Sequence, residues 1–341
     1  MSNRQQSAST PVPQFAQWRG CGRRAGLLLA LGAVFALPVH AQDADSSEEW
    51  ALDASQSSKG HGSISIGYQD TLVNGFKKHR GGTRDVGTVR IHALDLDVEY
   101  FFADRWSVRA GVPFVQSRYH GGFPHCPTRN PVPCQNPDVR VPDPEHPESR
   151  FLDDGDAHGT WQDWLLSVSY HTNIDNYYLT PSVTVLVPSH DYTFFAQSAV
   201  GQDLNKLRVG IELAHQFDFT ELYYKVDVAH VFAEETLGVS IDSNRLDLEL
   251  GYFVSPKLTL KTFAFYKRGD GIFSDDPRLR SSEFFYHHDQ ISKHEYFNVG
   301  LGLDYNIDDK TTLSTTAQTL IWGETVYNLR YSIDVRLTRD F

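Results

Sequence analysis

The chain ends with residues 327–341, Tyr-Asn-Leu-Arg-Tyr-Ser-Ile-Asp-Val-Arg-Leu-Thr-Arg-Asp-Phe, and no other stretch says more about its architecture. Apolar side chains occupy every second position from Tyr327 to Leu337, and polar side chains fill the positions between them. A period of two places the apolar side chains on one face of a β-strand, whereas a helix would scatter them around its surface. The segment therefore predicts a strand with one apolar and one polar face.

The same alternation recurs along the chain from Gly62 onward. In residues 94–100, for example, Leu, Leu, Val and Tyr alternate with Asp, Asp and Glu. We predict twelve strands, at residues 62–73, 88–101, 106–118, 160–171, 177–187, 205–217, 222–232, 242–253, 257–267, 295–305, 311–322 and 327–341.

The links between these strands alternate in length. Short links follow the even-numbered strands, whereas longer links follow the odd-numbered ones. The longest link covers about 40 residues, from Tyr119 to Gly159, and the last one, near Gly323, is an exception because it is short. An even number of antiparallel strands, with short turns on one side and long loops on the other, is typical of a bacterial outer-membrane barrel whose termini are both periplasmic.

Further observations favour this barrel over a secreted β-sandwich, which strands alone would also allow. Aromatic side chains such as Tyr100, Trp106 and Trp322 lie at strand ends, where membrane barrels carry interfacial girdles. Closure also leaves no strand edge unpaired in lipid. Phe341 matches the terminal residue that the barrel assembly machinery recognises, although Arg339 occupies a position that is usually apolar. The expected fold class is all-β, a transmembrane antiparallel barrel of about 12 strands.

The first residues have the layout of a secretory signal. Three arginines precede the apolar run 27–37, and Val39-His40-Ala41 follows as a cleavage site. The run is too short for a permanent membrane anchor. We therefore expect a signal peptide at 1–41, a polar periplasmic segment at 42–60 and the barrel at 61–341.

The charge balance argues against a nucleic-acid partner. The chain has 43 Asp and Glu against 31 Lys and Arg, a net charge of −12, whereas binding through phosphates requires a basic surface. Aromatic residues make up 13% of the chain, yet after the leader no run reaches the roughly 20 apolar residues of a transmembrane helix. This combination suits a barrel whose apolar residues alternate with polar ones.

Cys126 and Cys134 are expected to form a disulfide, because they lie eight positions apart in a proline-rich segment of an exported chain. The alternative is a zinc site that adds His125 and His120, but this spacing matches no compact zinc motif. The segment 153–159 resembles a calcium loop in composition and lacks its regular ligand spacing. We predict no metal site and no cofactor.

If the apolar faces contact lipid, the polar faces place seven Lys or Arg and ten Asp or Glu residues in the lumen. Simple hairpin registers set Asp97 opposite Arg109 and Glu249 opposite Lys261, and facing opposite charges are expected to pair. The other candidate lumen residues are Arg208, Glu212, Lys225, Asp227 and Arg245. A mixed interior presents the smallest electrostatic barrier to uncharged solutes. The alternative is that the charges only fill a narrow bore as ion pairs.

One pair of residues raises the question of an enzyme. Ser169 and His171 share a strand face, but two positions on one strand make a poor nucleophile–base pair, and no third residue orients the histidine. We therefore do not expect an enzyme.

Several short motifs carry a family resemblance. They are Leu96-Asp97-Val98-Glu99-Tyr100, Asp104-Arg105-Trp106-Ser107-Val108, Val112-Pro113, Gly155-Asp156 with Gly159 and Asp163, and Leu179 with Pro181 and Val187-Pro188. Through them the stretch from about Val86 to Phe341 resembles the phenol-degradation meta-pathway family of outer-membrane proteins and, more loosely, the long-chain fatty-acid transporter superfamily. The resemblance implies movement of small, often hydrophobic compounds across the outer membrane. Residues 42–59 are short and acidic where the fatty-acid transporters have an apolar hatch, so no lipid-binding site is carried over.

We expect a channel or transporter for small neutral or weakly hydrophobic solutes in the cell outer membrane, in contact with lipid and lipopolysaccharide. Two alternatives stay open at this point. One is a surface-binding or structural barrel, which the long loop 119–159 favours. The other is a lipid-modifying enzyme, since some twelve-stranded barrels place Ser and His on their lipid-facing surface.

Overall fold

The computed structural model describes residues 58–121 and 152–341. The predicted signal peptide and nearly all of the segment 42–60 lie outside the described residues. The predicted disulfide between Cys126 and Cys134, and His125 of the alternative zinc site, lie outside them as well.

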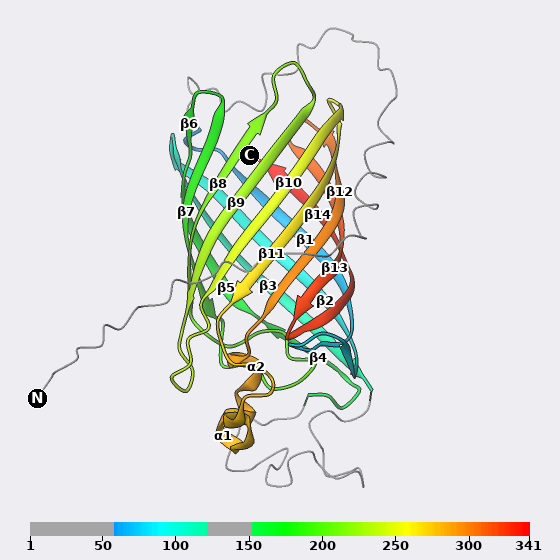
Figure 1. The fold of residues 1–341 in the computed structure, drawn as a ribbon. Coiled ribbons are helices and arrows are strands. Elements are labelled where there is room, and N and C mark those ends of the chain that lie inside the picture. The colour runs from blue at the N-terminus through cyan, green and yellow to red at the C-terminus, as the bar shows by residue number, and fades with distance from the viewer. Residues whose placement is uncertain (1–57, 122–151) are drawn as a thin grey trace, which may run out of the picture. The chain divides into compact units, whose positions relative to one another are not determined.

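The described residues consist almost entirely of β-strands (Figure 1). The strands are β1 (Gly62–Lys77), β2 (Thr83–Ala103), β3 (Trp106–His120), β4 (Ala157–Trp161), β5 (Asp163–Tyr170), β6 (Thr172–Ile174), β7 (Tyr177–Pro188), β8 (Lys206–Gln216), β9 (Leu222–Ala233), β10 (Ser243–Ser255), β11 (Leu258–Gly269), β12 (Glu295–Asp308), β13 (Thr311–Glu324) and β14 (Val326–Asp340). Between β11 and β12 lie a 3-10 turn (Pro277–Arg280) and two short helices, α1 (Ser282–Tyr286) and α2 (His288–Ile291).

Neighbouring strands pair antiparallel in chain order, and the sheet closes because β1 pairs with both β2 and β14. The short strands β4, β5 and β6 follow one another in the single position between β3 and β7. The result is a closed barrel of 12 strand positions, which confirms the predicted fold class. Eleven of the predicted strands lie inside an observed strand or extend at most two residues beyond it, and the predicted strand 160–171 covers the end of β4 and all of β5.

The outer face of the barrel is apolar. Ile64 is 54% exposed, Leu166 49% and Leu301 66%, and many other large apolar side chains on the same face are similarly exposed. Water would penalise this surface by about 25 cal/mol per Å², whereas the hydrocarbon of a membrane does not. A closed barrel with such an exterior is a membrane-spanning barrel, and its fold is that of outer-membrane proteins.

No helix in the described part of the chain has both the length and the apolar composition needed to cross a membrane.

The two ends of the barrel differ, as the lengths of the links predicted (Figure 1). The turn end carries the short connections, such as residues 104–105 and 256–257, and the paired residues Gly62 and Phe341. The loop end carries the long connections, together with the link of one residue, Thr325, between β13 and β14. The turn end is periplasmic and the loop end extracellular in barrels of this class.

Three of the long connections pack against one another and form a loop cap, defined here as residues 189–205, 234–242 and 270–294. Two clusters hold it together, Leu204, Val239, Ile241, Ile272 and Ile291 in one, and Phe195 with Tyr286 in the other. Gln202 and Gln290 donate through Nε2 to each other's backbone carbonyl, at 3.0 and 2.6 Å. The hydroxyl of Ser117, on the inner face of β3, donates to the carbonyl of Ser198 at 2.5 Å. The cap is therefore attached to the inner wall.

Candidate functional site: the barrel lumen

Alternation along each strand divides the side chains between lipid and lumen. On β3, exposed Trp106 points outward, so Ser107, Arg109 and Gly111 point inward. On β14, Arg336 points inward because a Cβ on Gly67 of β1 would meet its guanidinium at 3.2 Å. The predicted lumen residues occupy inward positions by the same alternation.

At the turn end, Asp97 binds two guanidinium groups. Arg109 donates to Oδ1 at 2.8 and 2.9 Å, and Arg336 donates to Oδ2 at 2.9 Å. Arg336 also lies 3.7 Å from Asp95. Asp97, Arg109 and Arg336 line a cavity of about 200 Å³ together with Ser63, Ser65 and Glu99. Arg109 and Arg336 are thus matched by Asp95 and Asp97, and Glu99 adds a further acid to the cavity.

Further toward the loop end, three more inward cations each contact a carboxylate. Arg208 donates to Asp227, and Lys261 donates to both oxygens of Asp304 at 2.8 Å. Lys225 Nζ lies 3.9 Å from Oε1 of Glu249, which also accepts a hydrogen bond from Tyr223 at 2.9 Å. A cavity of about 340 Å³ lies between these groups, and its other lining residues include Glu212, Asp247, Phe263 and Gln318. We call the five cations Arg109, Arg208, Lys225, Lys261 and Arg336, with their carboxylates, the paired section.

The predicted hairpin registers are wrong by two residues. Asp97 stands opposite Gly111, and Arg109 stands opposite Glu99, so the contact between Asp97 and Arg109 runs diagonally. In the second hairpin, Glu249 stands opposite Phe263. The physical reason is the position of each turn. The turns lie at residues 104–105 and 256–257, further along the chain than the predicted registers require, and the irregularities at residues 101–103 and 253–255 recover only part of the difference.

This shift changes the partners of two candidate residues. The prediction that Glu249 pairs with Lys261 is wrong, because Lys261 contacts Asp304 and Glu249 contacts Lys225 and Tyr223. Glu212 stands opposite Asp227, which in turn stands opposite Asp247, so three acids form a row across β8, β9 and β10. Arg208 forms an ion pair with Asp227, the middle acid of this row.

At the loop end the lumen carries a second group of cations, which we call the cationic section: Lys206, Arg245 and Lys267. Sequence reasoning included only Arg245. Lys206 and Lys267 were missed because each lies at the margin of a predicted strand, where alternation is a weaker guide to orientation.

The serine and histidine considered from the sequence do not meet. Instead, the hydroxyl of Ser107 lies 2.9 Å from Nε2 of His171 and donates to Oε1 of Glu99 at 2.7 Å. Ser107 is only 1% exposed, so its hydroxyl is closed off from a substrate. Ser107, His171 and Glu99 thus form a hydrogen-bonded cluster in the lumen at the turn end.

The calcium-like segment is also occupied by internal contacts. Asp153 is buried and accepts hydrogen bonds from Ser198 N and Oγ and from Gln197 N, at 2.7–2.9 Å. Asp154 contacts His158 at 2.8 Å. Within residues 58–121 and 152–341, no group of three or more His, Cys, Asp or Glu is arranged to hold a metal ion.

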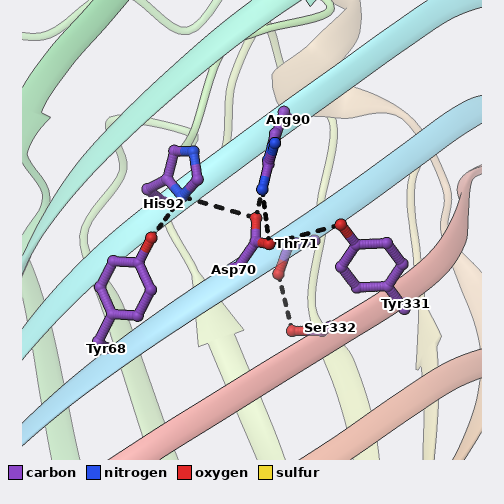
Figure 2. Close-up of polar contacts among 7 residues, drawn as sticks. All are labelled: Tyr68, Asp70, Thr71, Arg90, His92, Tyr331 and Ser332. Carbon is purple, nitrogen blue, oxygen red and sulfur yellow. Dashed lines mark hydrogen bonds and ion pairs between the residues drawn. The ribbon is translucent and has the colours of Figure 1, made fainter.

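One polar cluster lies on the outer wall, shown in Figure 2. Arg90 donates to both oxygens of Asp70 at 3.0–3.1 Å. His92 Nδ1 lies 2.8 Å from the hydroxyl of Tyr68, and Tyr331 approaches Asp70 at 3.4 Å. This outer-wall cluster follows directly on the apolar residues of β1 and β2, toward the loop end. In membrane barrels, charges on the outer face are tolerated near the interfaces rather than at the bilayer midplane.

Comparison with solved structures agrees with this architecture. An outer-membrane channel from Pseudomonas putida F1 matches with a TM-score of 0.61 and 13% identity, over 85% of this chain and 98% of that one. The KdgM porin matches with a TM-score of 0.43 and 10% identity, over 81% and 99% of the two chains. The toluene transporter TodX of P. putida matches with a TM-score of 0.39 and 11% identity, over 82% and 90%.

The first similarity shows the fold, and the other two are too weak to support an argument. No family model matches the chain, and no curated protein matches it.

Proposed function

We propose that this protein is an outer-membrane channel through which small, neutral or weakly hydrophobic solutes cross. The observation that carries the proposal is the contrast between the two faces of the barrel, apolar outside and polar inside, with cavities of about 200 and 340 Å³ among the inward charges. Mutual neutralisation in the paired section keeps the electrostatic barrier to uncharged solutes small. The proposal includes membership of the phenol-degradation meta-pathway family, which the sequence motifs support.

Liposome swelling tests this function directly. Vesicles that contain the purified protein are placed in isotonic benzyl alcohol or in an acidic sugar such as glucuronate. We expect entry of the alcohol to exceed both entry into protein-free vesicles and entry of the sugar. Equal rates with and without protein, or faster entry of the sugar, would reject the proposal.

The outer-wall cluster supports an accompanying role in lipid contact. We propose that Arg90 and His92 lie among the headgroups of lipopolysaccharide, because they follow directly on the apolar belt and Arg90 remains 54% exposed at its side chain. Binding of purified lipopolysaccharide to the detergent-solubilised protein tests this contact. Arg90→Gln is expected to weaken it and Arg105→Gln, at the turn end, is not. Equal binding by both variants would show that the cluster has no such role.

Assembly of the barrel through Phe341 also stays a proposal. Removal of Phe341 is expected to lower the amount of folded protein in the outer membrane, and an unchanged amount would reject it.

A further inference from the structure

The two lysines of the cationic section differ from the other inward cations. In the described part of the chain, no hydrogen bond or ion pair joins either Lys206 or Lys267 to another group, whereas each of the five cations in the paired section has a carboxylate within 4.0 Å. A charged group that leaves bulk water without a partner lowers stability. An anionic ligand that binds both lysines would offset this cost.

The strand register brings the cations together. Lys267 of β11 stands directly opposite Arg245 of β10, and both side chains point inward. Like charges in this position repel each other. Arg245 reaches Asp247 only at 3.7 Å, and its buried Nε has no hydrogen-bond partner in the described part of the chain. One guanidinium N–H is thus free to donate.

His294, which precedes β12, lies close to both Lys267 and Lys206. Its Nδ1 lies 2.5 Å from the carbonyl of Thr325. Burial lowers the pKa of His294 to about 4, and the nearby positive charges of Lys267 and Lys206 act in the same direction. The imidazole is therefore neutral at pH 7, while both lysines are near enough to influence it.

Two acids lie near this height: Asp163, which points inward from the loop end of β5 and lies near enough to influence Lys206, and Asp203, which lies close to Asp163. Oδ1 of Asp163 accepts a hydrogen bond from Tyr192 of the loop cap at 2.5 Å.

Aromatic rings complete the surroundings. The guanidinium carbon of Arg245 lies 4.8 Å from the centre of the Phe265 ring, and this ring lies 5.5 Å from that of Tyr296. Tyr296 stands opposite Lys267 on the neighbouring strand. An apolar surface thus lies beside the cations.

From this arrangement we infer that the cationic section is a binding site for a small carboxylate with an apolar body. The carboxylate accepts hydrogen bonds from Lys206, Lys267 and Nε of Arg245, and the apolar body packs on Phe265 and Tyr296. The inference rests on the proposed channel function and adds weakly hydrophobic acids to its solutes.

Hexanoate, with 1-hexanol as its uncharged match, is a suitable probe. Equilibrium binding to the detergent-solubilised full chain near pH 7 is expected to be at least about tenfold tighter for hexanoate than for hexanol, since charge-assisted hydrogen bonds account for the difference. Equal affinities would overturn the inference, and this comparison needs no variant.

The double variant Lys206→Gln/Lys267→Gln is expected to lose about tenfold in hexanoate affinity, with hexanol unaffected. Arg268→Gln is the matched control, because Arg268 follows Lys267 on β11 and is exposed on the opposite face. Unchanged hexanoate binding by the double variant, or an equal loss in the control, would overturn the site.

Planar-bilayer recordings separate this inference from the channel function. Block of the current by hexanoate, weaker in the double variant, supports both. Tight hexanoate binding without any conductance rejects the channel and leaves the site standing. Conductance with no preference for hexanoate rejects the site alone.

Discussion

Arg336 and Lys267 are both long cations on the inner wall of one barrel, but their surroundings are opposite. Arg336, in the paired section, reaches two carboxylates at 2.9 and 3.7 Å. Lys267, in the cationic section, faces Arg245 and has no carboxylate within reach in the described part of the chain. The comparison shows that the inward cations near the turn end are matched by carboxylates, whereas Lys267 near the loop end is not, and the proposed carboxylate site depends on this difference.

The largest effect is expected from a substitution that disrupts packing within the loop cap. Phe195 is completely buried and packs edge-to-face on Tyr286 and Phe285 at 5.6 and 5.7 Å. Phe195→Ala is expected to destabilise the cap by about 3–5 kcal/mol, because the cavity cannot collapse fully. Limited proteolysis of the folded protein should then cut residues 189–205 and 270–294 faster, and single-channel conductance should rise. Phe219→Ala, at a fully exposed turn position, is the control, and equal protection of both variants would contradict the role of Phe195.

The second prediction concerns a variant that removes a carboxylate at the turn end, so that its cations lack a partner as Lys267 does. Asp97→Asn leaves Arg109 and Arg336 without their shared carboxylate. One charge at about 5 Å in water contributes about 0.8 kcal/mol, so anion preference measured by reversal potential should rise about threefold to fivefold. The control Asp70→Asn removes the same charge from the outer wall. The contrast between the sections fails if both variants leave ion preference unchanged.

The strands and their faces were predictable from the sequence, because lipid imposes the same alternation on every strand. The single-residue link Thr325 and the long connection before β4 were visible as link lengths. Hairpin registers were not, because they depend on the exact position of each turn, at residues 104–105 and 256–257, and on the irregularity beside it. An error of two residues kept Asp97 and Arg109 within diagonal reach but separated Glu249 from Lys261.

The cationic section could not be predicted from the sequence for a different reason. Lys206, Arg245 and Lys267 come from three strands, and His294 comes from a connection of 25 residues that has no alternation. Only the pairing of the neighbouring strands β8 to β12 brings these residues together. A signal was present in the sequence, however, because all three cations lie within three residues of a loop-end strand terminus.

The third prediction concerns pH and uses the lowered pKa of His294. Unfolded histidine titrates near 6.5, so between pH 6.5 and about 4 the unfolded chain binds a proton that the folded chain does not. Stability attributable to His294 is therefore complete above pH 6.5 and is lost as the pH falls toward 4. Thermal melting at pH 7 and pH 5 measures the loss. His294→Asn keeps a donor for Thr325 and should show a smaller drop in Tm between the two pH values than the parent. A drop of the same size would mean that other groups account for it.

The smallest effect is expected outside the lumen. Arg339 forms an ion pair with Asp308 at 3.0 Å, and both side chains are more than half exposed. Arg339→Gln should change the free energy of unfolding by less than about 1 kcal/mol and leave ion selectivity unaltered. Urea titration and reversal potentials measure the two quantities, and a shift in selectivity would show that charge outside the lumen also governs permeation.

The seam between β1 and β14 has a consequence for the time course of folding. The hydroxyls of Ser65 and Thr338 meet across it at 2.9 Å, although 273 positions separate them in the chain. Because so large a loop must close first, this pairing is entropically the most demanding in the barrel and is expected late. Until it forms, both end strands keep unpaired backbone groups that can join another chain. Closure of this seam is therefore the step at which folding and aggregation compete.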